Sequence, residues 1–392
     1  MSSDPALIRP KLWTKNFVVL SSINFFVILI FFLLNATITL YAIDTFHASS
    51  SQAGLVAGIF IIGSLLGRLF IGSRNLSRKT LIACLVFFAL TTLLYFVEWD
   101  IGFLILVRLL NGFTVGVVST IVSTIVVFGL PASRRGEGIS YFAVSTALAT
   151  GIGPFIGLYM TQNTGFQMIF AFCALLGVVN LIVAWLVTFP AAVNSGVGAE
   201  KGCRLSSLIE PKVLPIAVTV FVMTFCFSGI VSYLNVYALE LGLVSTASFF
   251  FMVYTVFVLI SRPFTGKLTD RKSPELIMYP AFALYASGLL LLSSAAGSIS
   301  LLIAAALVAL GFGNISSVAQ ASAISRAEPH RVGLATATFF LFYDLGSGLG
   351  PTVMGLIIPL TGYKGLYFIL GFVVLAVLLL YGLTHFKRKQ YV

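Results

Sequence analysis

Phe17 to Tyr41 read FVVLSSINFFVILIFFLLNATITLY and contain no charged residue. The hydrocarbon core of a bilayer is about 30 Å thick, and an α-helix needs about 20 apolar residues to cross it. This stretch exceeds that length, and it is too long for the apolar part of a cleavable signal peptide. It therefore predicts a first membrane-spanning helix, and the same criterion applies outward along the chain.

Further apolar runs of comparable length follow the first one. They are continuous rather than alternating over about 10 residues, which excludes a transmembrane β-barrel. The sequence therefore predicts an all-α integral membrane protein with twelve transmembrane helices. The predicted spans are residues 16–43, 51–73, 79–98, 101–128, 137–161, 166–189, 212–239, 246–266, 275–295, 299–325, 332–360 and 365–385.

The composition of the chain agrees with this prediction. Of its 392 residues, 59% are hydrophobic and 9% are charged, whereas a soluble domain is about a quarter charged. A water-soluble enzyme or a nucleic-acid-binding protein is excluded, although the net charge is +11. The cysteines at 84, 173, 203 and 226 have the spacing of neither a disulfide framework nor a metal site. We expect each cysteine to act as a small apolar residue. We also expect no metal site and no cofactor.

The distribution of basic residues predicts the topology. Pro190–Pro211 is the only long polar break, so we expect a six-helix bundle in residues 1–190, a linker in 191–211 and a second bundle in 212–392. Nearly all Lys and Arg outside the spans fall on the side of the termini, and only Lys364 falls opposite. Basic loops stay in the cytoplasm, so both termini are predicted to be cytoplasmic in a plasma membrane, most simply a bacterial cell membrane.

The two predicted halves repeat in sequence. Arg68-Leu-Phe-Ile-Gly72 aligns with Arg262-Pro-Phe-Thr-Gly266 at an offset of 194 residues. Gly151-Ile-Gly153-Pro154 aligns with Gly348-Leu-Gly350-Pro351 at an offset of 197. A parallel repeat of six spans is typical of a transporter whose halves rock around a central site, so we predict two pseudo-symmetric bundles.

Polar side chains recur on the first, fourth, seventh and tenth predicted spans. Inside hydrocarbon, each must find a hydrogen-bond partner or a water-filled cavity. We interpret the recurrence as one central substrate cavity; the alternative is ordinary hydrogen bonding between packed helices. The predicted cavity residues are Asn24, Asn35, Asn111, Ser228, Ser232, Asn235, Asn314 and Ser317.

Two charged residues, Arg108 and Asp344, fall inside predicted spans. A charge at that depth is costly and requires a reason. Arg108 is either structural, as a clamp on backbone carbonyls or a side chain that snorkels to the outer face, or it takes part in proton coupling or substrate contact. Asp344 is either a permanently neutral structural carboxyl or the main proton-coupling group, which when ionised needs water or a cation such as Arg108 or the substrate.

Three motifs resemble those of a known family. They are Gly266-Lys-Leu-Thr-Asp270-Arg271, Arg108-Leu-Leu-Asn-Gly-Phe-Thr-Val-Gly116 and Gly151-Ile-Gly-Pro-Phe-Ile-Gly157. The whole chain resembles a major facilitator superfamily transporter, of the twelve-span drug or metabolite:proton antiporter group. The resemblance implies that the first motif closes a cytoplasmic gate, that the Arg of the second takes part in proton transfer, and that the third indicates export. The predicted gating residues are Arg68, Gly72, Arg262, Gly266, Asp270, Arg271, Gly153, Pro154, Gly350 and Pro351.

The chain also departs from that pattern. The N-terminal counterpart of the gating loop, residues 72–79, has no Asp, and the first span carries Asn24 and Asn35 where many exporters of cationic drugs have an acid. The first departure implies a looser or differently paired gate. The second weakens the case for an exporter of cationic drugs, and a cavity with Asn, Ser, Tyr and one Arg would suit a neutral or zwitterionic solute, such as a sugar or a secreted metabolite.

The sequence therefore predicts a secondary active transporter, not an enzyme, that exports a small organic solute by proton antiport. The alternatives are proton-coupled or facilitated uptake of a small polar solute and, from another class, a non-transporting membrane sensor. The spans hold no His/Glu metal pair and the chain no phosphate-binding loop. The expected partners are the solute, protons and the lipid bilayer, with no nucleic acid, and the expected functional unit is a monomer.

Overall fold

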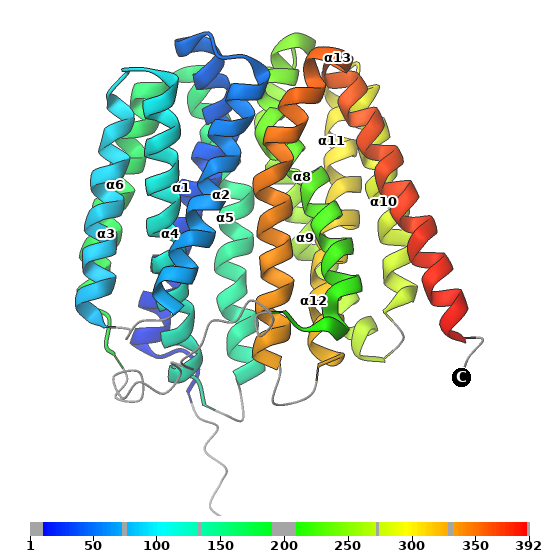
Figure 1. The fold of residues 1–392 in the computed structure, drawn as a ribbon, viewed down its shortest axis with the longest axis horizontal. Helices are drawn as coiled ribbons and strands as arrows, with labels where there is room; N and C mark the ends of the chain where they lie inside the picture. Colours follow the sequence, from blue (N-terminus) through cyan, green and yellow to red (C-terminus); the bar gives the residue numbers. More distant parts are fainter. Residues whose placement is uncertain are drawn as a thin grey trace, which may run out of the picture.

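The structure is a computed structural model, and it describes residues 11–72, 77–131, 135–189, 209–271, 274–327 and 332–389. Within these ranges the chain is built from helices, with no β-strand (Figure 1). Most of the helices are long and apolar enough to cross a membrane. The predicted all-α membrane fold is confirmed.

The structure gives the bounds of each helix within the described ranges. The bounds are α1 Lys15–Phe46, α2 Ser50–Gly72, α3 Arg78–Leu93, η1 Leu94–Phe96, α4 Ile101–Gly129, α5 Arg135–Asn163, α6 Phe166–Ala184, η4 Pro211–Val213, α8 Leu214–Leu241, α9 Val244–Arg271, α10 Glu275–Ser293, α11 Ser298–Val308, η5 Ala309–Gly313, α12 Asn314–Ser325 and α13 Val332–Lys389.

Helix ends are set by local capping. The Asp100 carboxylate accepts a hydrogen bond from the Phe103 amide at 2.6 Å and begins α4, and the Ser77 hydroxyl accepts one from the Thr80 amide at 3.1 Å and begins α3. Such side chains satisfy amides that lack a partner within the helix. Gly242 ends α8 with φ 66°, a left-handed conformation that favours glycine.

Helix α13 contains two membrane crossings. By length and composition, 11 helices of the described chain can cross a membrane, and the last of them spans 47 residues, Ala335–Tyr381. Gly362, with φ 67° and ψ 176°, breaks this helix. The first part rises (orange in Figure 1) and the second part descends (red). The break separates the predicted spans 332–360 and 365–385.

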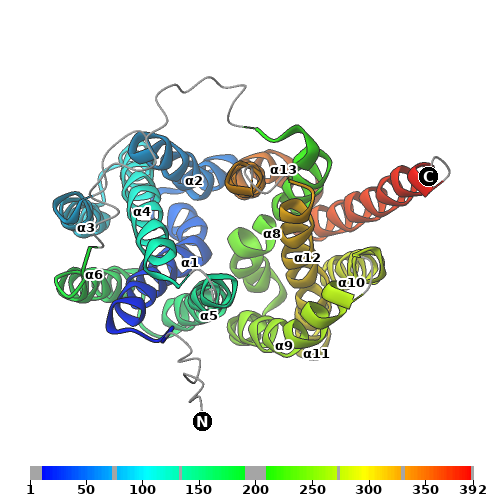
Figure 2. The same cartoon turned by 90° about the horizontal axis from the view of Figure 1, so that it is seen from below.

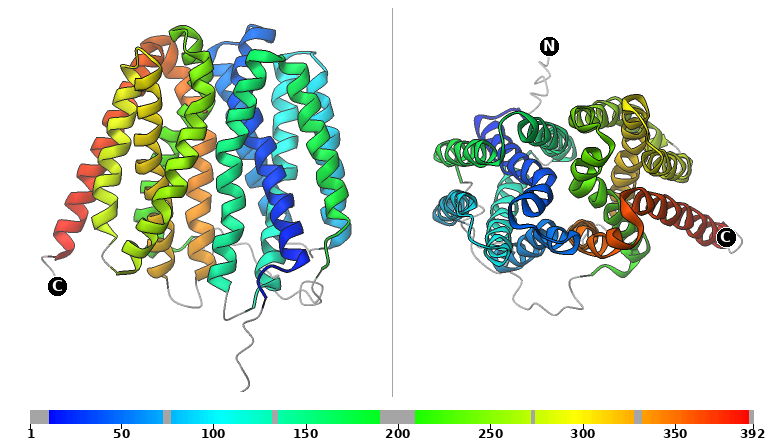
Figure 3. Two further views of the ribbon diagram at one scale, coloured as in Figure 1. Left: turned by 180° about the vertical axis from the view of Figure 1, so that it is seen from behind. Right: turned by 90° about the horizontal axis from the view of Figure 1, so that it is seen from above.

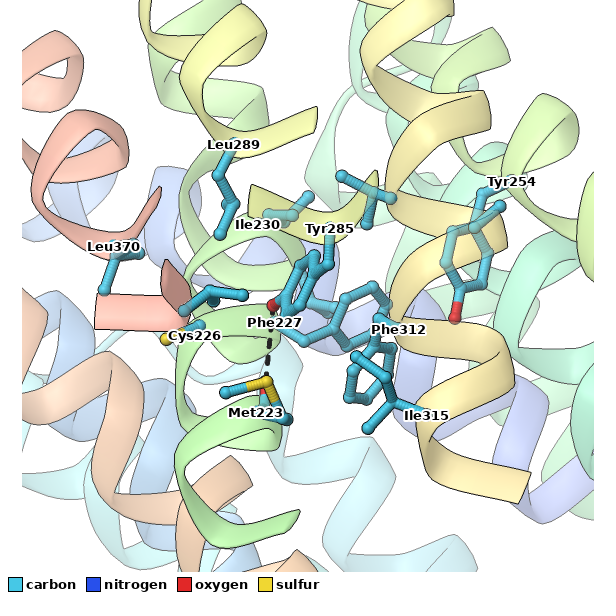
Figure 4. Packing of buried hydrophobic residues seen from close by; sticks show 14 of the residues in the cluster. Met223, Cys226, Phe227, Ile230, Tyr254, Tyr285, Leu289, Phe312, Ile315 and Leu370 are labelled. Carbon is cyan, nitrogen blue, oxygen red and sulfur yellow. Dashed lines mark hydrogen bonds between the residues drawn. The ribbon is translucent and has the colours of Figure 1, made fainter. Parts of the chain in front are cut away.

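The tenth predicted span, 299–325, is not one regular helix. It consists of α11, a π-helical turn (η5) and α12. A Cβ at Gly311 would lie 2.5 Å from the backbone nitrogen of Tyr285, so this turn packs directly on α10. The turn also places Phe312 in a stack on Phe227, with ring centroids 4.2 Å apart (Figure 4). Figure 4 shows Cys226 in the same apolar core, and its thiol is free.

Helices α1–α6 lie together on one side of the molecule and α8–α13 on the other (Figure 2). Each group has a cluster of buried apolar residues, and the cluster of α8–α13 also includes Ala36 of α1 and Leu158 of α5. We call these groups the N half and the C half. We call the side where α1 begins and α13 ends the terminal side, and the other the distal side; Figure 3 shows the bundle from behind and from the distal side. The predicted linker, 191–211, falls largely outside the described residues.

Candidate functional site

An ion pair joins the two halves. Arg68, near the end of α2, places its Nη1 atom 2.6 Å from Oδ2 of Asp344 on α13. The Asp344 side chain is 13% exposed and that of Arg68 is 37% exposed. Asp344 Oδ2 and Arg68 Nε lack hydrogen bonds to the rest of the described chain, so the contact is mainly one of charge. The carboxylate is thus neutralised from the opposite half, by a residue that we had expected only in gating.

The second buried charge, Arg108, is held within the N half. Its side chain is fully buried. Nε donates to the Val56 carbonyl at 3.0 Å, and Nη2 donates to Asn35 Oδ1 at 3.0 Å and to the Ala57 carbonyl at 3.4 Å. The guanidinium carbon also lies 4.6 Å from the centroid of the Phe60 ring, a cation–π contact.

This geometry is that of a clamp joining α1, α2 and α4. It corrects one expectation: in the described chain, the cation paired with Asp344 is Arg68 rather than Arg108. The two charges therefore have different surroundings, one between the halves and one inside the N half.

Asn24 and Asn111 bond to neighbours in their own half. Asn24 Nδ2 donates to the hydroxyls of Ser145 and Thr146 on α5, both at 2.9 Å. Asn111 is fully buried, and its Nδ2 donates to the hydroxyls of Thr91 and Thr92 at 3.1 and 3.2 Å. Asn111 is therefore directed toward α3 and does not join the other predicted cavity residues.

The polar stripe of α8 is different, because part of it has no partner. Ser228 Oγ donates to the Phe225 carbonyl at 2.7 Å. The Ser232 hydroxyl and both polar atoms of the Asn235 amide, although almost completely buried, make no hydrogen bond to the described residues. The Ser232 carbonyl accepts from Thr39 on α1, in the other half. Buried polar groups without partners are costly, so this face of α8 is the best candidate in the described chain for binding a polar group or water.

Asn314 and Ser317, on α12, are bonded within the C half. Asn314 Nδ2 donates to the Leu310 carbonyl at 2.7 Å, and its Oδ1 accepts from the hydroxyls of Ser261 and Thr265 at 3.2 and 3.1 Å. Ser317 donates to the Asn314 carbonyl at 3.1 Å. Asn314 thus fixes the end of the π-helical turn against α9.

The repeated glycine motifs pack each half against the other in an equivalent way. A Cβ at Gly151 of α5 would collide with Thr255 of α9, and a Cβ at Gly348 of α13 would lie 2.9 Å from Ile61 of α2. The next glycine of each motif, Gly153 or Gly350, packs on the first helix of its own half. These positions are related by the offsets found in the sequence, so the repeat extends to the contacts between halves.

Contacts between the halves also gather on the distal side. The Tyr233 hydroxyl on α8 lies 3.1 Å from the Ser50 carbonyl, at the start of α2, and 2.8 Å from the Pro351 carbonyl. Gln162, at the end of α5, donates to the Ser248 hydroxyl of α9 at 2.6 Å. Of these residues only Pro351 was predicted, since a single polar residue near a helix end carries no pattern. In the described chain the two halves meet closely on the distal side.

Only some of the predicted gating residues have described side chains. Pro154 lies within α5, and the Pro351 carbonyl accepts a hydrogen bond from Tyr233. Arg262, Gly266, Asp270 and Arg271 belong to α9, and Gly72 ends α2, but their side-chain positions lie outside the described residues. Their roles stay predictions.

Comparison with known proteins identifies the family. The sequence model of the Major Facilitator Superfamily matches residues 20–313 and 246–390. An uncharacterized MFS-type transporter of Methanocaldococcus jannaschii, MJ1560, is 27% identical over 340 residues, covering 83% of this chain and 86% of that protein. The uncharacterized MFS-type transporter YtbD of Bacillus subtilis is 24% identical over 364 residues, covering 88% and 89%.

Solved structures share the fold. A POT family transporter in complex with a thioalcohol-conjugated peptide matches with a TM-score of 0.76 at 13% identity, over 95% of this chain and 96% of that chain. The nucleoside transporter NupG matches with a TM-score of 0.74 at 14% identity, over 93% and 98%. The family and its named relatives are transporters and not enzymes, as predicted. This chain therefore belongs to the major facilitator superfamily of transporters.

Proposed function

We propose that this transporter exports a small neutral or zwitterionic organic solute by proton antiport, through alternating access in the plasma membrane. The observation that carries the proposal is the Arg68–Asp344 ion pair, because it connects the halves that must move apart and one member can bind a proton. A group whose charge changes between two conformations couples them to proton binding.

The coupling follows from the electrostatics of the pair. When Asp344 is ionised, its attraction to Arg68 holds α2 and α13 together toward the terminal side. Protonation removes that attraction and leaves a neutral carboxyl, which costs less to bury. Proton binding therefore favours a state in which these helices separate, and proton release favours the paired state.

The solute class is inferred from the free polar groups of α8. Ser232 and Asn235 offer a hydroxyl and an amide, hence both donors and acceptors, without a formal charge. A solute with hydroxyl or amide groups would satisfy them, whereas neither side chain carries a charge that could neutralise a permanent cation. This agrees with Asn24 and Asn35 standing in the first span, where many exporters of cationic drugs have an acid.

Direction and orientation rest on the sequence. The Gly151–Gly157 motif resembles that of antiporters, which supports export, and the basic residues near the terminal side support cytoplasmic termini. On this orientation, the distal contacts close the outer side, and the conformation described is closed to the exterior. A single chain contains both halves and the ion pair, so we expect a functional monomer.

The test is transport by inside-out membrane vesicles from cells that produce the protein, with a panel of radiolabelled neutral, zwitterionic and cationic solutes. We expect a neutral or zwitterionic solute to accumulate when the vesicle interior is acidic, and not when the pH gradient is collapsed. Accumulation that ignores the pH gradient, or that occurs only in right-side-out vesicles, contradicts proton-driven export.

A further inference from the structure

The C half contains an apolar groove on its membrane-facing surface. The groove has a volume of about 440 Å³ and lies between α9, α10 and the π-helical turn. Its lining includes Phe257, Ser261, Phe264, Ala281, Leu284 and Leu310. The volume is within the range of small-molecule binding sites, about 300–1,000 Å³.

The groove opens toward lipid. Phe264 and Ile260 on its rim are 72% and 58% exposed, and Leu276 on α10 is 49% exposed. Large apolar side chains this exposed on a transmembrane helix face acyl chains. The residues of α9 that line the groove lie toward its end at Arg271, and those of α10 lie toward its start at Glu275. Because both of these helix ends are on the terminal side, the groove lies in the leaflet on that side. Figure 2 shows α10 at the outer edge of the C half.

The equivalent seam of the N half is closed. There α2 and α4 pack through Gly63, Gly67, Gly112 and Gly116, and a Cβ at any of the four would overlap a carbonyl oxygen of the facing helix. Small residues allow this close approach of transmembrane helices. The repeat therefore provides an internal comparison: one half has a sealed seam and the other an open one.

The sequence explains the difference. At the offset of 194 residues, Gly63 and Gly67 of α2 correspond to Phe257 and Ser261 of α9. Both replacements line the groove, and their side chains stand where the N half has the glycines that let α2 and α4 approach closely. The π-helical turn adds a local widening of that span next to Leu310, and such turns are frequent at functional sites.

We propose that this groove binds the acyl chain of a membrane phospholipid from the leaflet on the terminal side. The polar atoms of Asn314, the deepest polar residue of the lining, are bonded to Leu310, Ser261 and Thr265. The amide of Asn314 therefore has no free group to offer a ligand, and the rest of the contact surface is mainly hydrocarbon. Such a surface suits an acyl chain and not a polar solute. A groove of defined volume binds a chain more tightly than an open helix face, where neighbouring lipids exchange without preference.

The experiment uses tryptophan fluorescence with brominated phospholipids, whose bromine atoms quench nearby indoles. In a background with Trp13, Trp99 and Trp185 changed to Phe, one reporter is Phe264→Trp, on the rim of the groove. The matched control is Phe70→Trp, the equivalent position of the N half at the offset of 194, where the seam is closed. Phe70 is 42% exposed, so both reporters contact lipid.

We expect the fluorescence of Phe264→Trp to be quenched at lower mole fractions of brominated lipid than the fluorescence of Phe70→Trp. This corresponds to a relative lipid-binding constant that is several-fold higher at the groove than at the control position. A second change, Ala281→Leu, fills part of the groove and should bring the Phe264→Trp constant down to that of the control. Equal constants at the two reporters would show exchange with surrounding lipid only and would overturn the proposal. Relief of the quenching by an added non-lipid solute would assign the groove to that solute and would also overturn it.

Discussion

Replacing Gly58 by Ala should shift the balance between the two access states without unfolding the protein. A Cβ at Gly58, on α2, would lie 2.1 Å from the carbonyl oxygen of Gly348, on α13, whereas real Cβ atoms keep at least 3.0 Å. The obstacle is backbone, so it cannot rotate away, and the two helices must separate by about 1 Å. Because α2 and α13 belong to different halves, the strain exists only while the distal contacts are closed.

Overpacking of this kind costs about 1–3 kcal/mol. A bias of that size changes the ratio of two conformations by about 5–150-fold. The population of the state open on the distal side should rise by a factor in that range, as long as the state remains the minor one.

The assay is the reaction rate of a buried cysteine with a membrane-impermeant maleimide. Ser232→Cys, in a background without the native cysteines, is suitable because Ser232 is completely buried on α8 and its carbonyl bonds Thr39 of the other half. We expect Gly58→Ala to raise the labelling rate from the distal side by at least several-fold.

The matched control is Gly63→Ala. Its Cβ would lie 2.1 Å from the Leu109 carbonyl oxygen, the same overlap but within the N half. That contact is present in both access states, so the control should lower the thermal stability and leave the labelling rate nearly unchanged. Equal labelling rates for wild type and a folded Gly58→Ala protein would refute the reasoning that the α2–α13 contact breaks during transport.

Three other outcomes are expected. Arg108→Lys cannot supply all the hydrogen bonds of the guanidinium, so its unfolding free energy should fall by about 2–3 kcal/mol, visible as a lower midpoint of thermal unfolding; an unchanged midpoint would argue against the clamp. Single cysteines in the Pro190–Pro211 loop and in place of Lys364 should be labelled from opposite sides of the membrane, and labelling of both from outside would contradict the topology. Asp270→Asn should slow transport while equilibrium solute affinity, measured by calorimetry, stays within a few fold; loss of binding by a folded variant would show that Asp270 belongs to the binding site.

The membrane spans could be predicted because the bilayer imposes a simple length and polarity requirement on each helix. The run from Phe17 to Tyr41 satisfies it and lies within α1. The repeat of Arg68 and Arg262 with their glycines likewise predicted two related halves. The π-helical turn at Ala309–Gly313 could not be predicted, because the apolar pattern continues through it and its close contact, Gly311 on Tyr285, is with another helix.

The site was harder to predict than the fold. Helical periodicity assigns a side chain to a face but does not identify the helix that covers that face. Asn111 was predicted to line the central cavity, yet its amide donates to hydroxyls of α3. Asp344 was identified as a costly charge, but its partner Arg68 lies on a helix of the other half, and no local pattern connects the two.

The most direct test of the account is transport by an Asp344→Asn variant in proteoliposomes, with the solute that the vesicle panel identifies. Asparagine keeps the size of the side chain but cannot bind and release a proton, and it cannot form the ion pair with Arg68. We predict that accumulation driven by an imposed pH gradient disappears, while solute exchange and downhill flux persist. Accumulation driven by the pH gradient at the wild-type rate in this variant would contradict the assignment of Asp344 as the coupling group.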